Sequence, residues 1–172
     1  MGDMMVYICS RRAWNPSLDP GLLQDESFEC HYGNAATTIR EYLVKPRRIP
    51  STWPSHENCN APYYCYGLTE KRGREGVAYF DEALKLADSP EVRNRVEKAL
   101  ICAHRLAMGK VWYGTEPENM TGEIKAEYRR LARNIFALCE KHGVNEHGES
   151  RPIEGVVAKV CKALQMGRDK RL

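Results

Sequence analysis

The sequence predicts an all-α protein, an irregular bundle of about six to seven helices with one long loop rich in proline and aromatic residues. Three observations support this class. Apolar residues recur at spacings of three and four along most of the chain, which is typical of helices with one buried face. Capping residues followed by proline mark helix starts. No segment shows the alternating apolar and polar pattern of a strand.

The stretch from Trp14 to Leu43 predicts two helices and the joint between them. Asp19 can cap a helix that starts at Pro20, because proline has the fixed φ that suits the first helical position and its missing N–H costs nothing there. Gly33 suits a left-handed turn that ends this helix. Asn34 can cap a second helix, which Pro46 forbids from continuing. We therefore expect a tight corner at Gly33 with φ > 0.

The first residues predict a short helix that ends at Trp14. They carry more apolar surface than a frayed terminal segment needs, in Met4, Met5, Tyr7, Ile8 and Trp14. An exposed patch of this kind tends to be covered by another protein surface. We therefore expect the isolated chain to self-associate through residues 4 to 14 and the aromatic loop around Trp53 to Tyr66.

Four helical patterns follow the loop. Ser89 before Pro90 repeats the cap-plus-proline signal and opens the longest pattern, which can be the spine of the bundle. Thr121 can cap the next helix, and Gly143 can end it. The expected helices lie within residues 73–88, 89–113, 121–143 and 153–164.

A chain of 172 residues can bury one sizeable core. We predict a single helical domain over residues 1–166, with a loop inserted at 45–68, and a charged tail at 167–172 that frays. A tetratricopeptide-like solenoid is a minor alternative, although no period near the roughly 34 residues of that repeat recurs.

Charge and hydropathy argue against nucleic acid and membrane partners. The formal net charge is +3, and charges of both signs are interspersed. No basic patch interleaved with aromatic residues occurs, and no apolar run approaches the roughly 20 residues of a membrane span. The start of the chain lacks the uninterrupted apolar core of a signal peptide. We therefore expect a cytoplasmic protein in a reducing compartment.

The seven cysteines fit no zinc motif, and their number is odd. His56, Cys59 and Cys65 are the only grouping that suggests a metal, and we interpret them as loop residues. We expect Cys102, Cys139 and Cys161 to lie on helices, with Cys102 and Cys161 as small buried apolar side chains. The sequence predicts no metal and no cofactor.

No catalytic constellation is apparent. Asp25 with Glu26, and Asp81 with Glu82, are adjacent on helices, where neighbours point about 100° apart and cannot form the facing acid pair of a glycoside hydrolase. We interpret them as solvated helix faces. His104 has no cysteine or aspartate at a spacing that would make it a base, so we interpret it as a satisfied core or boundary histidine.

Residues 45 to 67 form the best local candidate for a contact surface. The segment holds four prolines and is long for a loop, and long loops are commonly functional or disordered. Its aromatic residues could contact a partner domain or a sugar ring, or could pack the loop onto the bundle. With two aromatic residues outside the loop, the predicted contact surface comprises Trp14, Tyr32, Trp53, Tyr63, Tyr64 and Tyr66.

One family resemblance rests on the same early stretch. The residues that carry it are Trp14-Asn15-Pro16 with Asp19, then Phe28, then His31-Tyr32-Gly33-Asn34-Ala35-Ala36, and then Ile39 and Tyr42. A weaker echo lies at residues 79–83 and at Arg95-Val96. This pattern resembles the C-terminal helical domain of the bacterial domain of unknown function 4838 family, over roughly residues 4 to 112. His31 stands where that pattern has Tyr or Phe.

The resemblance implies a fold and a function. Larger members of that family look like glycoside hydrolases, in which an α-glucuronidase-like or hexosaminidase-like barrel precedes the helical domain. It therefore implies a fragment that is a non-catalytic helical portion of a carbohydrate-active protein and docks on a barrel absent from this chain. Its expected partners are a barrel domain or a second copy of the chain, with carbohydrate as a further candidate. The alternative is a free-standing helical protein-interaction module.

Overall fold

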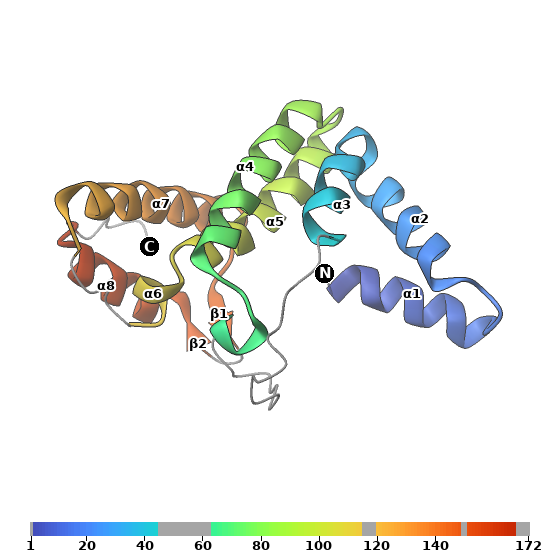
Figure 1. The fold of residues 1–172 in the computed structure, drawn as a ribbon, viewed down its shortest axis with the longest axis horizontal. Helices are drawn as coiled ribbons and strands as arrows, with labels where there is room; N and C mark the ends of the chain where they lie inside the picture. Colours follow the sequence, from blue (N-terminus) through green and yellow to red (C-terminus); the bar gives the residue numbers. More distant parts are fainter. Residues whose placement is uncertain (1, 45–62, 115–119, 149–150, 168–172) are drawn as a thin grey trace. The chain divides into compact units, whose positions relative to one another are not determined.

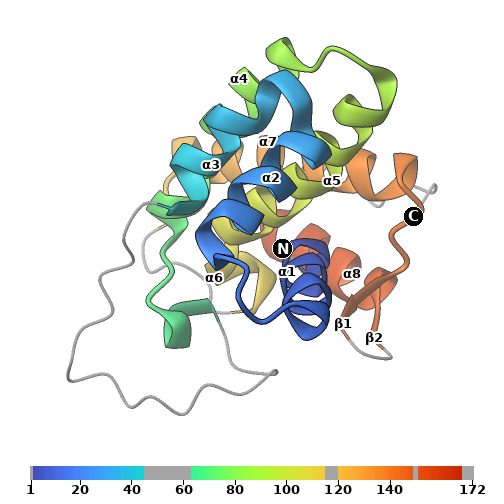
Figure 2. The same ribbon diagram turned by 90° about the vertical axis from the view of Figure 1, so that its right-hand side faces the viewer.

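The computed structural model describes residues 2–44, 63–114, 120–148 and 151–167. The predicted all-α class is confirmed, because the described residues form seven α-helices of nine residues or more, one short helix and a very small sheet (Figures 1 and 2). The α-helices are α1 (Gly2–Trp14), α2 (Pro20–Tyr32), α3 (Ala36–Val44), α4 (Glu70–Leu86), α5 (Pro90–Ala107), α6 (Gly109–Trp112), α7 (Gly122–Lys141) and α8 (Ile153–Leu164).

The shorter elements are two 3-10 helices and one strand pair. They are η1 (Gly33–Ala35), η2 (Tyr63–Tyr66), β1 (Glu146–Gly148) and β2 (Arg151–Pro152). None of the described helices has both the length and the apolarity that crossing a membrane requires. Most of the predicted loop 45–68 and most of the charged tail lie outside the described residues.

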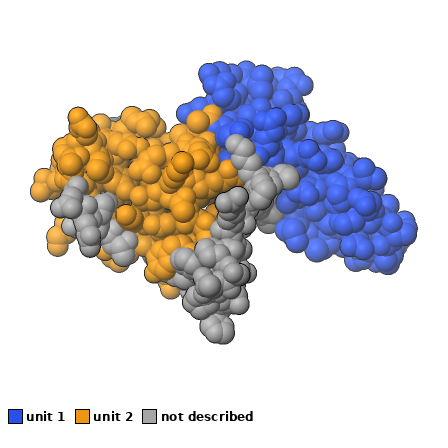
Figure 3. All heavy atoms as spheres, viewed as in Figure 1, with its two compact units in different colours: residues 1–45, 79–97 blue, residues 46–78, 98–172 orange. Residues whose placement is uncertain are grey.

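The chain divides into two compact units (Figure 3). Unit 1 comprises residues 1–45 and 79–97, and unit 2 comprises residues 46–78 and 98–172. The C-terminal part of α4 and the N-terminal part of α5 therefore belong to unit 1, and the remaining parts of these two helices belong to unit 2. Whether the two units fold as the single domain that the sequence predicts stays a prediction.

The core of unit 1 is built from one apolar face of each helix other than α1. Tyr42 on α3 joins this core through its ring, whose centroid lies 5.8 Å from the ring centroids of both Tyr79 and Phe80 on α4. The buried apolar side chains of this unit are Leu23, Phe28, Ala35, Ala36, Ile39, Tyr42, Phe80, Ala83, Val92 and Val96.

Three of the predicted caps start their helices as expected. The Leu22 N–H donates to Asp19 Oδ1 at 2.9 Å, and Pro20 is the first residue of α2. The Val92 N–H donates to the Ser89 hydroxyl at 3.1 Å at the start of α5. Thr121 accepts from the Ile124 N–H at the start of α7 in the same way.

The corner at Gly33 has the predicted positive φ but a different conformation from a left-handed turn. Gly33 has φ 49° and ψ −130°, and the chain continues into η1 before α3 begins at Ala36. The prediction that Asn34 caps the second helix is wrong, because Asn34 lies inside η1 and α3 begins two residues later at Ala36. The corner thus takes one more turn than the sequence indicated.

Unit 2 has its core between α7, α8 and the end of α5. Helices α7 and α8 pack together and bury one face each (Figure 1). The buried apolar side chains of α7 and α8 are Tyr128, Leu131, Ala132, Ile135, Phe136, Cys139, Ile153, Val156, Val157, Val160, Cys161 and Leu164. From α5 onward, Ala103, Ala107, Met108, Val111 and Trp112 are also buried.

Three features of the elements differ from the sequence prediction. Helix α4 begins at Glu70 rather than near Gly73, because Thr69 caps it by accepting from the Arg72 N–H at 3.1 Å. The helix that the sequence predicts to be the longest ends at Ala107 as α5 with 18 residues, shorter than the 20 residues of α7, and the short helix α6 follows after Met108. A small strand pair that no alternating pattern in the sequence indicates is also present, since β1 and β2 are antiparallel with Glu146 opposite Pro152.

Candidate binding site

Helix α1 carries apolar side chains on two sides. Met4, Tyr7 and Ile8 lie at the spacing of one helical stripe, the inner stripe, which packs on α2. Met5 and Val6 form the outer stripe, and their side chains are 55% and 68% exposed. No described side chain of α1 is fully buried. The packing of α1 on α2 therefore leaves the outer stripe uncovered.

The connection from α1 to α2 exposes further apolar surface. Trp14 is 93% exposed and Leu22 is 71% exposed. With the outer stripe, these make four of the eight large apolar side chains that are exposed in the described part of the chain. The α1–α2 hairpin is therefore the most apolar exposed part of unit 1.

A polar contact holds α1 on α2 beside the inner stripe. The Arg11 guanidinium donates to the Tyr7 hydroxyl at 3.2 Å and lies 3.8 Å from the Glu26 carboxylate. Partial loss of solvent and a hydrogen bond with Glu26 raise the pKa of Tyr7. Because the Arg11 and Glu26 side chains are 48% and 45% exposed, the contact contributes little to stability.

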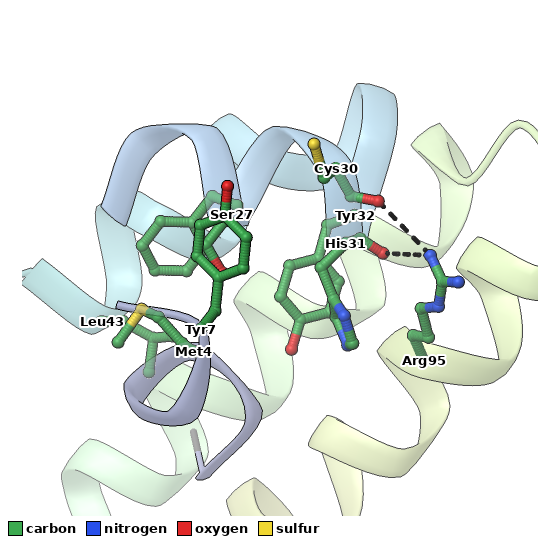
Figure 4. A pocket seen from close by; sticks show the side chains of 9 residues that line it. Met4, Tyr7, Ser27, Cys30, His31, Tyr32, Leu43 and Arg95 are labelled. Atoms are coloured by element: carbon green, nitrogen blue, oxygen red, sulfur yellow. Dashed lines mark hydrogen bonds between the residues drawn. The ribbon is translucent and has the colours of Figure 1, made fainter. Parts of the chain in front are cut away.

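A pocket of about 240 Å³ lies in unit 1 beside the inner stripe (Figure 4). Helices α1, α2, α3 and α5 all contribute to its wall. The lining residues are Met4, Tyr7, Ser27, Phe28, Cys30, His31, Tyr32, Leu43 and Arg95. The pocket is smaller than the roughly 300–1,000 Å³ typical of drug-sized ligand sites, so only a small molecule fits it.

Arg95 is the charged group of the pocket wall. Its Nη1 donates to the carbonyl oxygens of His31 at 3.1 Å and Cys30 at 3.4 Å, which are the last carbonyls of α2 (Figure 4). The guanidinium thereby satisfies acceptors that the helix itself leaves open. No carboxylate in the described part of the chain pairs with Arg95, and neither Asp nor Glu lines the pocket.

Two aromatic rings at the end of α2 form part of the same wall. The His31 and Tyr32 rings meet edge to face with centroids 4.6 Å apart, and Phe28 stacks on Tyr32 at 6.4 Å. Tyr32, which the sequence placed in a contact surface, therefore lines a pocket. Trp14 lies in the same unit at the far end of α1 and is not among the lining residues.

The three loop tyrosines of the predicted contact surface lie in unit 2. Tyr63 packs on Gly109, and its ring meets the rings of Tyr64 and Tyr113 at 5.5 and 5.7 Å. Tyr64 is exposed and Tyr66 is half-buried. Trp53, the sixth predicted residue, lies outside the described residues, as do His56 and Cys59, which the sequence analysis interprets as loop residues.

The adjacent carboxylates Asp25 and Glu26 contact different cations, as expected for neighbours on a helix. Asp25 pairs with Arg40 at 2.6 Å, whereas Glu26 pairs with Arg11. Glu82 pairs with Lys85 one turn away on its own helix at 2.6 Å. Each of these three carboxylates is thus engaged with a separate surface cation rather than with a second acid.

A hydrogen-bonded network in unit 2 is structural in character. Glu70 accepts from the Tyr128 hydroxyl at 2.7 Å and from the Lys110 backbone N–H at 2.8 Å. Burial and the hydrogen bond to Glu70 raise the pKa of Tyr128. Arg74 pairs with Glu127 at 2.8 Å beside it. The network ties the starts of α4 and α6 to α7.

His104 is buried in unit 2, as predicted, but it is not fully satisfied. Its side chain is 2% exposed, and Nδ1 has no hydrogen-bond partner. Burial, with a smaller effect of Arg130, lowers the pKa of His104 from 6.5 to about 4. The imidazole is therefore neutral at physiological pH and makes a poor general base without an oriented partner.

The cysteines follow the prediction only in part. Cys139 and Cys161 are buried, but the prediction that Cys102 is buried is wrong because its side chain is exposed. Burial raises the pKa of Cys139 to about 11, so its thiol stays protonated. Among the described residues no three His, Cys, Asp or Glu side chains lie close enough to hold a metal ion.

Sequence reasoning did not find the pocket. The sequence places Tyr32 in a predicted contact surface and Arg95 only in the family resemblance. A signal was present in the run Phe28 to Tyr32, where three ring-bearing residues lie within two turns of one helix. Their convergence with α1 and with Arg95 depends on tertiary packing.

Comparison with known proteins gave no match: no family model, no curated protein and no solved structure matches this chain. The resemblance to the domain of unknown function 4838 family therefore stays a prediction. What the chain itself provides is an uncovered helix, a small pocket and a set of paired surface carboxylates.

Proposed function

We propose that this chain is a non-catalytic helical module that docks on another protein domain through α1. The outer stripe of α1, Met5 with Val6, supports this proposal most directly. Isolated helices of about a dozen residues are marginal in water and depend on tertiary packing. None of the described side chains of this 13-residue helix is fully buried, so a partner that covers α1 would stabilise it.

Our specific candidate for the partner is the barrel domain that the family resemblance implies. Such a barrel would carry the acid and base of a carbohydrate-active enzyme, and the present chain would supply a docking surface. The pairing of Asp25, Glu26 and Glu82 with separate cations supports the non-catalytic part of the proposal. Binding of carbohydrate by the barrel rests on the resemblance alone.

A second candidate is a free-standing interaction module that covers α1 with a second copy of itself. The same observation favours it, because the outer stripe is self-complementary in its apolar character. The two candidates differ in the partner and share the surface.

The experiment measures the mass of the assembly by light scattering over a concentration series. The chain is measured alone and mixed with a barrel domain encoded beside it in the same genome. The double variant Met5→Glu/Val6→Glu tests the outer stripe, since charges there leave the inner stripe in place. Ile124→Glu is the matched control, because Ile124 is also an exposed apolar residue but lies on α7.

Assembly that is lost in Met5→Glu/Val6→Glu and kept in Ile124→Glu supports the proposal, and the mixture identifies which partner is used. A chain that stays monomeric at every concentration and ignores the barrel contradicts it. Assembly that survives the double variant would show that α1 is not the docking surface.

A further inference from the structure

We propose that the pocket of unit 1 binds a small aromatic carboxylate. This inference does not depend on the docking function. It rests on the size of the pocket, the side chains of its wall and the charge of Arg95.

The size sets the scale of the ligand. An engineered cavity of about 150 Å³ binds benzene. The pocket here measures about 240 Å³, which leaves room for one ring and a short substituent. Nucleotides and oligosaccharides are excluded because they need a larger site.

The wall favours an aromatic body for the ligand. Met4 and Leu43 give aliphatic surface, and Phe28 and Tyr32 give ring surface. Aromatic rings attract one another in edge-to-face and offset arrangements beyond the effect of burial alone. The Tyr32 ring already makes such an edge-to-face contact with the His31 ring, and this contact orients the Tyr32 ring in the wall.

The charge of Arg95 favours a carboxylate as the substituent. Its Nη1 is engaged with the α2 carbonyls, whereas its Nε and Nη2 donate to no group in the described ranges of the chain. A helix C-terminus carries the equivalent of about half a negative charge. The helix end therefore offsets only part of the guanidinium charge. Guanidinium binds carboxylate with matched, charge-assisted hydrogen bonds.

The lining residues offer no counter-charge that would reject an anion. The wall has one arginine, one histidine and three hydroxyl groups, and it has no acidic side chain. A cationic ligand of the same shape would meet Arg95 without a carboxylate to pair with it. The pocket should therefore distinguish ligands of one shape by their charge.

The experiment measures binding of three ring compounds to the whole chain by calorimetry. The probes are benzoate, benzyl alcohol and benzylamine, which share a ring and differ in charge. We expect benzoate to bind at least about tenfold more tightly than benzyl alcohol, because a hydrogen bond to a charged group is worth about one factor of ten or more. Benzylamine should bind most weakly.

Three variants assign the binding to the pocket. Arg95→Gln should remove the preference for benzoate over benzyl alcohol. Arg93→Gln is the matched control, because Arg93 lies on the same helix and also donates to a helix-end carbonyl, that of Leu84 at 3.2 Å, but does not line the pocket. Leu43→Phe should fill the pocket and weaken all three probes while the charge of Arg95 is kept.

The proposal is overturned if benzoate does not bind, or if it binds no more tightly than benzyl alcohol. Binding that is unchanged in Leu43→Phe would place the ligand elsewhere and would also overturn it. Thermal unfolding of each variant shows whether it is folded. If Arg95→Gln does not fold, Arg95→Lys replaces it, and a weaker but persistent preference for benzoate supports the proposal, whereas no preference contradicts it.

Discussion

Gly73 on α4 lies directly against the backbone of Ala107 at the end of α5. A Cβ atom at Gly73 would lie 2.6 Å from the Ala107 Cα, and it would be closer still to the Ala107 nitrogen. Because the obstacle is backbone rather than a movable side chain, the two helices can approach this closely only with glycine at position 73. Both residues belong to unit 2, so this contact sets the helix spacing there.

Gly73→Ala should therefore destabilise the protein. Alanine favours a helix interior over glycine by about 1 kcal/mol, but overpacking of a tight contact typically costs about 1–3 kcal/mol. We expect the steric cost to win and the midpoint of urea unfolding to fall. Gly155→Ala on α8 is the control, since a Cβ there meets nothing within 4 Å. Stabilisation in both variants would contradict the close approach.

The corner at Gly33 gives a second test of backbone geometry. Gly33→Val should lower the melting temperature clearly, because a β-branched residue at φ 49° costs on the order of 1–3 kcal/mol. Asp88 adds to the cost, since its Oδ1 would lie 3.3 Å from the new Cβ. Gly122→Val is the control at a position with open space. Equal melting temperatures for the two variants would show that the joint is built differently.

His104 should make stability depend on pH. Its pKa is about 4 in the folded chain and 6.5 when exposed, so the unfolded chain takes up a proton first as the pH falls. The free energy of unfolding therefore has its full value, as far as His104 is concerned, above pH 6.5. It decreases as the pH falls toward 4. Between pH 7 and pH 5 the loss amounts to about 2 kcal/mol.

The measurement compares urea unfolding of the protein with that of His104→Leu at both pH values. The difference in unfolding free energy between the two proteins should change by that amount, because other titrating groups are common to both. The variant also removes the unpartnered Nδ1 from the core, so it should be at least as stable at pH 5. An unchanged difference would mean that His104 is solvated or paired.

The pure chain should not hydrolyse aryl glycosides. Glycoside hydrolysis needs two carboxyl groups that face each other across the bond, and Asp25 and Glu26 are held by separate cations. A chromogenic assay over a range of pH values tests this. Turnover that disappears in Asp25→Asn or Glu26→Gln would contradict both the prediction and the proposed docking role.

Helix starts were the most predictable part of the fold. Asp19, Ser89 and Thr121 act through hydrogen bonds to residues three places ahead, so the information is local. The start of α4 was missed because Glu70, Lys71 and Arg72 add no apolar residue to the periodic pattern. The break after Ala107 was missed although a local signal is present, because Gly109, a residue that weakens helices, follows Met108 directly.

The candidate site was less predictable than the helices. The exposure of α1 follows from its apolar residues, which lie on two sides of the helix. When one side packs on α2, the other side stays exposed. The pocket could not be foreseen, because Arg95 reaches the end of α2 across more than 60 residues of sequence. The exposure of Cys102 was likewise hidden, since apolar neighbours in sequence do not share its side of the helix.

The division of α4 and α5 between the two units has a consequence for synthesis on the ribosome. Unit 1 needs residues 79–97 as well as residues 1–45, so its first three helices emerge long before their remaining core exists. Residues 46–78 of unit 2 are synthesised before unit 1 is complete. Their own unit is complete only after residues 98–172 have been synthesised. Neither unit is a contiguous piece of chain, so the core of unit 1 can form only after Glu97 has been synthesised, and that of unit 2 only later still.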